Sequence, residues 1–181
     1  MQIGFFGNPK RSDIKTYLPD WLAWLTGLGH KCNLPLELAN LINAPENSKI
    51  RICASIKDFV AKSETIVTLG GDGTILLLSN HIGSAATPIL GIKFGGLGFL
   101  ADGTPEEFQA ALQEVIDGTA SVQERIVLSG LVKGGEKHEP AYGLNDFVVS
   151  RTHSSQSSRI HIGIDGEQVG KFVGDGIIIS T

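Results

Sequence analysis

Apolar and polar positions alternate in blocks along the first two thirds of the chain, and the blocks suit strands and helices in turn. The runs QIGFFG and PILGIKFG predict buried strands, and TIVTL lacks polar alternation, as expected of a strand covered on both faces. A helix is predicted in DIKTYLPDWLAWLTGLG, with Pro19 near its start and Gly27 or Gly29 near its end. Four leucines follow its helical spacing: Leu18, Leu22, Leu25 and Leu28.

Capping signals mark two further helices. Ser55 and Asp58 have capping-box spacing in SIKDFVAKS, and DGTILLLSNHIG fits a helix that starts at a glycine-rich turn. The clearest helix is TPEEFQAALQEVIDG, where Thr104 is expected to cap, Pro105 to take the first helical position and Glu107 to close the capping box. Phe108, Leu112 and Val115 are expected to form its apolar face, and Gly118 is expected to end it. The segment ELANLINAPENSKIR remains ambiguous.

The pattern changes near residue 120. Beyond it RIVLSGLVKG, AYGLNDFVVSR, SRIHIGIDG and EQVGKFVGDGIIIST are all strand-like, Asp165-Gly166 is a hairpin signal, and THSSQSS is a polar connection. We therefore expect an α/β fold: a Rossmann-like N-terminal domain with a mainly parallel sheet over residues 1–120, then a partial β-rich domain over 121–181. Because the sequence stops on the strand GDGIIIST with no predicted partner, we expect a piece of a longer protein.

The composition limits the kinds of binding partner and the cellular compartment that we expect. The chain has 181 residues, 41% hydrophobic and 19% charged, with a net charge of −4, which argues against a nucleic-acid or anionic membrane surface. No apolar run approaches the roughly 20 residues of a membrane helix, and the N-terminus lacks a signal-peptide pattern. The two cysteines, Cys32 and Cys53, form no metal-type pair and fit a reducing compartment, so we expect a cytoplasmic protein, with an isolated disulfide left open. The five histidines show no metal-ligand spacing.

The run LGGDGT is the main candidate for chemistry. Gly70, Gly71 and Gly73 between a buried strand and a helix expose backbone N–H groups at the positive end of the helix, which suits phosphate. A carboxylate there needs another task, so Asp72 is expected to hold Mg²⁺, accept a proton from an attacking hydroxyl, or bind ribose hydroxyls. The structural alternative is a plain turn in which Asp72 caps the next helix.

Three other segments are weaker candidates on their own. Asn145 and Asp146 open a predicted strand, where turn chemistry is the simpler explanation, and Asp175 lies between two glycines that suit a hairpin or bulge. The cluster KFGGLGFLADG does not match the dinucleotide fingerprint; Phe99 there is placed to stack on a flat ring, although such residues more often lie in a core.

Taken in order, IVTLGGDGT, GIKFGGLGFLAD, VQERIVL, GLNDFVVS and GDGIIIST resemble the NAD kinase family, which phosphorylates NAD to NADP with ATP. The resemblance implies that Asp72 is catalytic, activating the adenosine-ribose 2′-hydroxyl of NAD, and that Mg²⁺ accompanies ATP. It implies an ATP-phosphate loop of Gly70, Gly71, Gly73 and Thr74. It also implies an NAD site made of Asp72, Gly73, Phe99, Asn145, Asp146 and Asp175.

The resemblance is not complete in detail. Asp146 stands where the family usually has Glu, which shortens the reach of the carboxylate, and Lys93 and Gly96 depart from the usual GINxGxLGFL pattern. It implies NAD and ATP as partners and, for the full-length protein, a homo-oligomer that binds neither nucleic acid nor membrane. Two alternatives stay open: a lipid kinase of the diacylglycerol type, and a nucleotide-binding fragment without turnover.

Overall fold

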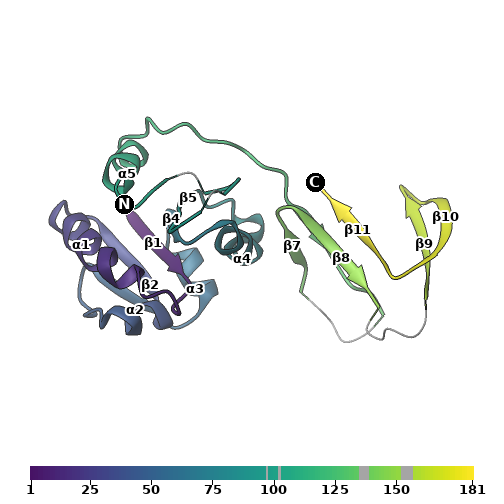
Figure 1. Ribbon diagram of the computed structural model, residues 1–181, viewed down its shortest axis with the longest axis horizontal. Helices are drawn as coiled ribbons and strands as arrows, with labels where there is room; N and C mark the ends of the chain where they lie inside the picture. The colour runs from purple at the N-terminus through teal and green to yellow at the C-terminus, as the bar shows by residue number, and fades with distance from the viewer. Residues whose placement is uncertain (97, 102, 135–138, 152–156) are drawn as a thin grey trace. The chain divides into compact units, whose positions relative to one another are not determined.

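The computed structural model describes residues 1–96, 98–101, 103–134, 139–151 and 157–181 (Figure 1). They form two compact units, Met1–Glu124 and Arg125–Thr181. The first unit is an α/β domain with a five-stranded sheet, and the second consists of small antiparallel sheets. The predicted fold class is confirmed.

The sheet of the first unit is parallel throughout, in the order β3-β2-β1-β4-β5. Every residue of β4 is buried, as its uninterrupted apolar run predicted. The strands are β1 (Gln2–Gly7), β2 (Lys31–Pro35), β3 (Ile50–Cys53), β4 (Thr65–Leu69) and β5 (Ile89–Ile92).

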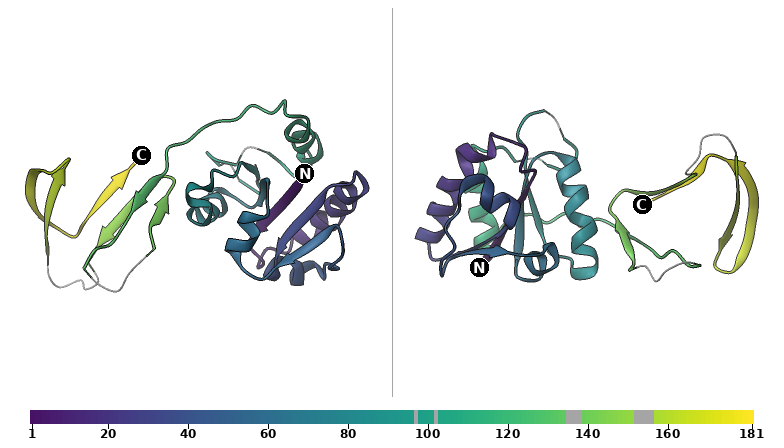
Figure 2. Two further views of the ribbon diagram at one scale, coloured as in Figure 1. Left: turned by 180° about the vertical axis from the view of Figure 1, so that it is seen from behind. Right: turned by 90° about the horizontal axis from the view of Figure 1, so that it is seen from below.

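Helices cover both faces of this sheet, as the two views of Figure 2 show. Alternate residues of β4 divide the core: Val67 and Leu69 pack with α1, α2 and α5, and Ile66 packs with α3 and α4. The helices are α1 (Ile14–Gly27), α2 (Leu36–Ile42), α3 (Ile56–Ala61), α4 (Asp72–Ile82) and α5 (Phe108–Asp117), with a short 3₁₀ turn, η1 (Gly83–Ala85), after α4. The face holding α1 and α5 is the more aromatic, and the Trp21 and Phe108 rings stack there at 3.9 Å.

Helix α1 differs from its prediction in two places. Pro19 lies inside the helix rather than near its start. Proline removes the helical hydrogen bond to the Lys15 carbonyl, and both residues lie on the exposed side of the helix, where this loss is best tolerated. Leu28 is 53% exposed instead of joining the buried leucines, because the helix ends at Gly27 and the chain turns at Gly29.

Helix α5 begins later than predicted, at Phe108, so the placing of Pro105 at the first helical position is wrong. The Glu107 carboxylate does accept the Thr104 N–H at 3.1 Å, and this hydrogen bonding lowers the pKa of Glu107. However, the Thr104 hydroxyl donates to the same carboxylate instead of accepting a helix N–H, so the first helical bond runs from Ala111 N–H to the Glu107 carbonyl. The Ser55 cap of α3 is confirmed, since its side chain accepts the Asp58 N–H.

The second unit holds three antiparallel pairs in its described residues: β6 with β7, β8 with β11, and β9 with β10. Asp165 and Gly166 join β9 to β10 with φ values of 52° and 87°, which confirms the predicted hairpin. Residues 152–156 of the predicted connection THSSQSS lie outside the described residues. The strands are β6 (Leu128–Gly130), β7 (Ala141–Gly143), β8 (Asp146–Ser150), β9 (Ser158–Ile164), β10 (Glu167–Gly174) and β11 (Gly176–Ser180).

Both cysteines are buried free thiols, so the disulfide that the sequence left open is not formed. Burial raises the pKa of Cys32 to about 12, and it also raises the pKa of Cys53. Neither thiol therefore has the low pKa of a reactive cysteine.

Candidate functional site

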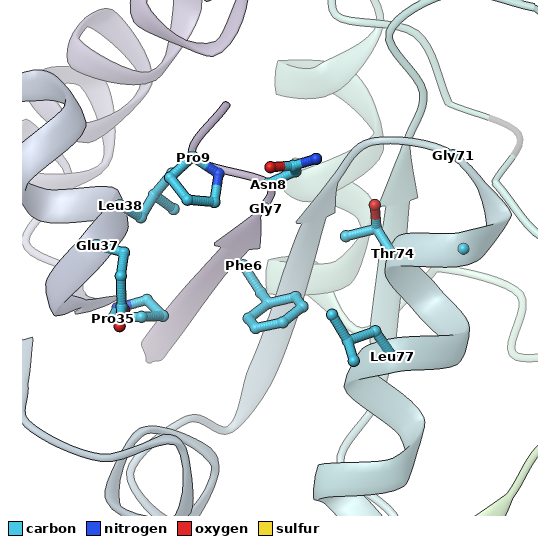
Figure 3. Close-up of a pocket in the computed structure, with 11 residues that line it drawn as sticks. Phe6, Gly7, Asn8, Pro9, Pro35, Glu37, Leu38, Gly71, Thr74 and Leu77 are labelled. Atoms are coloured by element: carbon cyan, nitrogen blue, oxygen red, sulfur yellow. The ribbon is translucent and has the colours of Figure 1, made fainter. Parts of the chain in front are cut away.

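The sheet order places a crevice at the carboxyl ends of β1 and β4. From β1 the sheet grows one way to β2 and β3 and the other way to β4 and β5, and ligands of open α/β sheets bind where the order reverses. A cavity of about 610 Å³ lies there (Figure 3). It is lined by the end of β1 and the loop after it, the start of α2 and the β4–α4 turn: Phe6, Gly7, Asn8, Pro9, Pro35, Glu37, Leu38, Gly71, Gly73, Thr74 and Leu77.

The glycines of the β4–α4 turn differ in what surrounds them. A side chain at Gly70 would overlap the Thr74 hydroxyl, so this position needs glycine for packing within the turn. At Gly71 and Gly73 no described atom lies within 4 Å of an added Cβ, and both residues line the cavity. Bare backbone at these two positions is therefore turned toward open space rather than toward the protein interior.

Asp72 is the first residue of α4 and follows the N-cap residue Gly71. Its carboxylate accepts three backbone N–H groups from the loop after β5: Phe99 at 2.8 Å, Leu100 at 3.0 Å and Ala101 at 3.2 Å. A Cβ added to Gly98 would come within 2.6 Å of the Asp72 carboxylate, so glycine is required for this close approach. The carboxylate is therefore bound to a loop far along the chain, which a plain helix-capping turn does not require.

The same loop is held at its other end by Arg11, from the loop after β1. The Arg11 guanidinium donates to the Phe94 carbonyl at 2.6 Å, and its carbon lies 5.6 Å from the centre of the Phe94 ring. It also pairs with both carboxylate oxygens of Asp13. This hydrogen-bonded pair raises the pKa of Arg11 and lowers the pKa of Asp13.

At the end of the loop that Asp72 binds, an aromatic side chain is exposed. Phe99 is 90% exposed although its N–H is fixed on Asp72. Gly95 and Gly96 are exposed as well, with no described atom within 4 Å of an added Cβ. The sequence left open whether Phe99 lies in a core, and in the structure its side chain is not part of the core of the first unit.

The candidates of the second unit lie at the two ends of the β8–β11 pair. Asn145 and Asp146 are exposed at one end, where the Asn145 carbonyl accepts the Thr181 N–H at 2.9 Å. Asp175 precedes β11 at the other end, and its carboxylate pairs with Arg151 at 2.9 Å. The register of the pair sets Asp146 opposite Ser180 and Gly176 opposite Ser150, so Asp146 and Asp175 lie about five residue steps, roughly 17 Å, apart along the strands.

Sequence reasoning found the glycine turn and missed the opposite wall of the cavity. The wall contributed by Phe6, Asn8 and Pro9 directly follows β1, and the Gly-Asn-Pro turn after a buried strand was an available signal. Pro35 and Glu37 were missed because they flank β2, whose sequence KCNLP carries too few apolar residues to stand out as a strand. No group of three metal-binding side chains occurs within the residues that the structure describes.

An open parallel sheet with helices on both faces and a glycine-rich turn at its switch point defines a doubly wound α/β protein of the nucleotide-binding type. A family model described as the ATP-NAD kinase N-terminal domain matches residues 3–120. The chain therefore belongs to the NAD kinase family, as its motifs indicated. It is similar to the NAD kinase of Desulforamulus reducens, with 31% identity over 180 residues, and to that of Bacteroides fragilis, with 36% identity over 181 residues.

The alignments cover 99% and 100% of this chain but only 61% and 62% of those relatives, so the chain spans about three fifths of their length. Two solved structures share the fold. The crystal structure of yeast NADH kinase complexed with NADH gives a TM-score of 0.82 at 24% identity, covering 99% of this chain and 57% of that one. The NAD kinase from Archaeoglobus fulgidus in complex with ATP gives 0.67 at 19% identity, covering 99% and 60%. Among the described helices, none has the length and apolar character needed to span a membrane.

Proposed function

We propose that the protein is an NAD kinase that transfers the γ-phosphate of ATP to the 2′-hydroxyl of the adenosine ribose of NAD. One observation carries this proposal. The chain belongs to the NAD kinase family, and its glycine turn lines a cavity at the switch point of the sheet. Gly70, Gly71, Gly73 and Thr74 are assigned to the ATP phosphates, because backbone N–H groups at a helix start suit an anion.

Asp72 is assigned two tasks. As the base it accepts the proton of the ribose hydroxyl while the phosphoryl group transfers, a contribution of roughly 10²–10⁴ in rate. Its carboxylate also binds the three N–H groups from Phe99 to Ala101, and a carboxylate has about four acceptor sites in all. The group that takes the proton therefore also positions the loop that carries Phe99.

The acceptor NAD is assigned to Asp72, Gly73 and Phe99 of the first unit and to Asn145, Asp146 and Asp175 of the second. The separation of Asn145 and Asp175 along β8–β11 supports an extended ligand, and a dinucleotide has hydrogen-bonding groups along its whole length. An exposed aromatic ring at Phe99 supports stacking on one of its flat rings.

Mg²⁺ is the metal that the family implies, and the residues present fit a limited role for it. Mg²⁺ in phosphoryl-transfer enzymes keeps several waters and binds through substrate phosphates with few protein ligands. Among the described residues, the cavity lining includes Glu37 and no lysine or arginine, so these residues leave part of the triphosphate charge for a metal to neutralise. Bound with ATP, it would supply that counter-charge in the transition state.

The whole protein is also proposed to be a homo-oligomer. Apolar side chains exposed on the second unit support this, because a monomer rarely keeps such a surface bare. They include Val148, Val149, Phe172, Val173, Ile178 and Ile179. Light scattering on the whole protein gives the test, and a monomer at micromolar concentration overturns the proposal.

The direct test of function offers the whole protein ATP and Mg²⁺ with each acceptor in turn. NADP formation from NAD supports the proposal. Phosphorylation of diacylglycerol in vesicles without NADP formation would establish the lipid-kinase alternative. ATP binding without transfer to any acceptor would establish a binding protein without turnover.

A further inference from the structure

We propose that Arg151 is a positioning residue for the dinucleotide, because its guanidinium holds the Asp175 carboxylate in the orientation in which that carboxylate binds NAD. Arg151 follows the last residue of β8, and Asp175 lies between β10 and β11. This inference deepens the proposed function. It rests on the assignment of Asp175 to NAD, and it adds the residue that orients the Asp175 side chain.

Asp175 lies where the chain crosses from one pair of strands to another. Gly174 ends β10 and is opposite Ser158 of β9, whereas Gly176 begins β11 and is opposite Ser150 of β8. Asp175 is therefore the single residue between two strands that have different partners. The hydrogen-bond ladders on both sides determine the course of its backbone, but neither ladder determines the direction of its side chain.

The backbone at this crossing is closely packed against β8. The Arg151 N–H donates to the Asp175 carbonyl at 3.0 Å, which extends the β8–β11 pairing by one residue. A Cβ added to Gly176 would overlap the Val149 carbonyl oxygen, so glycine is required for this close approach. The main chain of Asp175 is thus held in place, and the remaining freedom lies in the torsions of its side chain.

The ion pair with Arg151 removes that freedom. Arg151 Nη2 lies 2.9 Å from Asp175 Oδ1, and the two side chains are 25% and 79% exposed. The guanidinium is therefore the more enclosed partner, and the carboxylate is open to a ligand. Among the residues that the structure describes, the second oxygen, Oδ2, makes no ion pair or hydrogen bond. One oxygen is anchored, and the other can accept a hydrogen bond from a ligand hydroxyl.

The charge of the pair also suits the proposed ligand. NAD carries a negatively charged pyrophosphate, which an uncompensated carboxylate nearby would repel. Arg151 offsets the charge of Asp175 and leaves one of its oxygens able to accept a hydrogen bond. An ion pair with so exposed a partner contributes little to the stability of a fold. Its effect is therefore expected in ligand binding rather than in unfolding.

The test measures NAD binding by calorimetry, and the KM values for NAD and ATP, on the whole protein. Arg151→Ala is expected to raise the Kd and the KM for NAD about threefold to tenfold, because the carboxylate turns freely and its charge is uncompensated. The KM for ATP stays within about twofold. Arg151→Lys should recover part of the loss, since an ammonium keeps the charge without the forked geometry. Arg159→Ala, at an exposed arginine on β9 of the same unit, is the matched control and should bind NAD normally.

A double-mutant cycle separates positioning from a direct contact with NAD. In an Asp175→Ala background, Arg151→Ala is expected to change the Kd for NAD by less than about twofold, because no carboxylate is left to orient. Thermal unfolding shows that each variant folds. If Arg151→Ala does not fold, Arg151→Gln, which keeps most of the stem and loses the charge, takes its place in the same cycle.

The inference is overturned if Arg151→Ala binds NAD as tightly as the unsubstituted protein, or if it weakens binding equally with and without the Asp175 carboxylate. Either result leaves the proposed NAD kinase activity standing. If NAD binding depends on Arg151 through Asp175 but the protein forms no NADP, the positioning role stands and the proposed function fails.

Discussion

At the residue scale, Asp72 carries two assignments that need to be separated. Its carboxylate is directed at the N–H groups of Phe99, Leu100 and Ala101, on a loop 27 to 29 residues further along the chain. Loss of this carboxylate therefore removes a base and releases a loop at the same time. Gly98 offers a way to disturb the loop while the carboxylate stays in place, because it packs directly against Asp72.

Asp72→Asn is expected to lower kcat by roughly 10²–10⁴, because an amide cannot take the hydroxyl proton. Steady-state kinetics with ATP, Mg²⁺ and NAD on the whole protein gives the measurement, and thermal unfolding checks that the variant folds. Near-normal turnover in a folded Asp72→Asn protein refutes the assignment of Asp72 as the base.

Gly98→Ala is the companion to that experiment. The added methyl would come within 2.6 Å of the Asp72 carboxylate, so the loop must shift while the base is retained. We expect an increased KM for NAD and a loss of kcat much smaller than that of Asp72→Asn. Equal losses of kcat in the two variants would assign the whole effect to loop position and leave no role for a base.

At the scale of elements, the loop after β5 is fixed between two others. Arg11 from the β1 loop binds the Phe94 carbonyl, and Asp72 from the start of α4 binds the N–H groups of residues 99–101. Phe94 and Phe99 are both held through their backbone, so the exposed Phe99 side chain is attached to a backbone that hydrogen bonds fix in place. Arg11 is thus a positioning residue that acts through the loop.

Arg11→Ala is expected to raise the KM for NAD several-fold with a smaller change in kcat, because the loop loses one anchor and the base stays in place. Arg11→Lys should recover part of the loss, since an ammonium can still donate to the Phe94 carbonyl although it lacks the forked geometry. Lys15→Ala, an exposed position on α1, is the control. If kcat and the KM for NAD are unchanged in Arg11→Ala, the positioning role is wrong.

The ion pair of Arg11 with Asp13 predicts a pH dependence of stability. Hydrogen bonding to Arg11 lowers the pKa of Asp13 below its ordinary value of 3.8. A lowered pKa in the folded state stabilises the fold above the unfolded pKa, and this contribution is lost as the pH falls through the folded value. The stability gap between the unsubstituted protein and Asp13→Asn should therefore be constant near neutral pH and shrink below about pH 4, as measured by urea unfolding. A gap that does not shrink contradicts the assignment.

At the scale of the whole molecule, the residues proposed for ATP belong to the first unit alone, and those proposed for NAD belong to both units. The glycine turn that is assigned to the ATP phosphates lies within Met1–Glu124, and Asn145, Asp146 and Asp175 lie within Arg125–Thr181. Substitutions of these residues of the second unit should therefore change the requirement for NAD more than that for ATP.

Asn145→Ala is expected to raise the KM for NAD more than the KM for ATP, because its amide is assigned to the dinucleotide. Glu167→Ala, an exposed position on β10, serves as the control in the same unit. Kinetics at saturating levels of the second substrate give each value. A rise confined to the KM for ATP would show that Asn145 is assigned to the wrong ligand.

The sequence by itself determined the elements whose causes are local. Apolar runs correctly predicted β1, β4 and β5, the Ser55 cap predicted α3, and Asp165-Gly166 predicted the hairpin. The glycine turn and its place between a strand and a helix were also readable, because turn geometry and helix capping depend on residues a few positions apart. The sequence placed Pro19 and Pro105 wrongly within their helices. Where a helix begins depends on which of its first backbone N–H groups are bound by other parts of the chain, and the local sequence does not show this.

Only the tertiary structure decided which distant groups meet. The strand order β3-β2-β1-β4-β5 places the β1 loop beside the β4–α4 turn and creates the cavity, and Arg11 reaches Phe94 across 83 residues. Hydrophobic periodicity indicates which face of a strand is buried, but it does not indicate which strands are neighbours in the sheet. Short strands buried on both faces look alike in sequence, so their order, and with it the site, follows from the packing of the whole sheet.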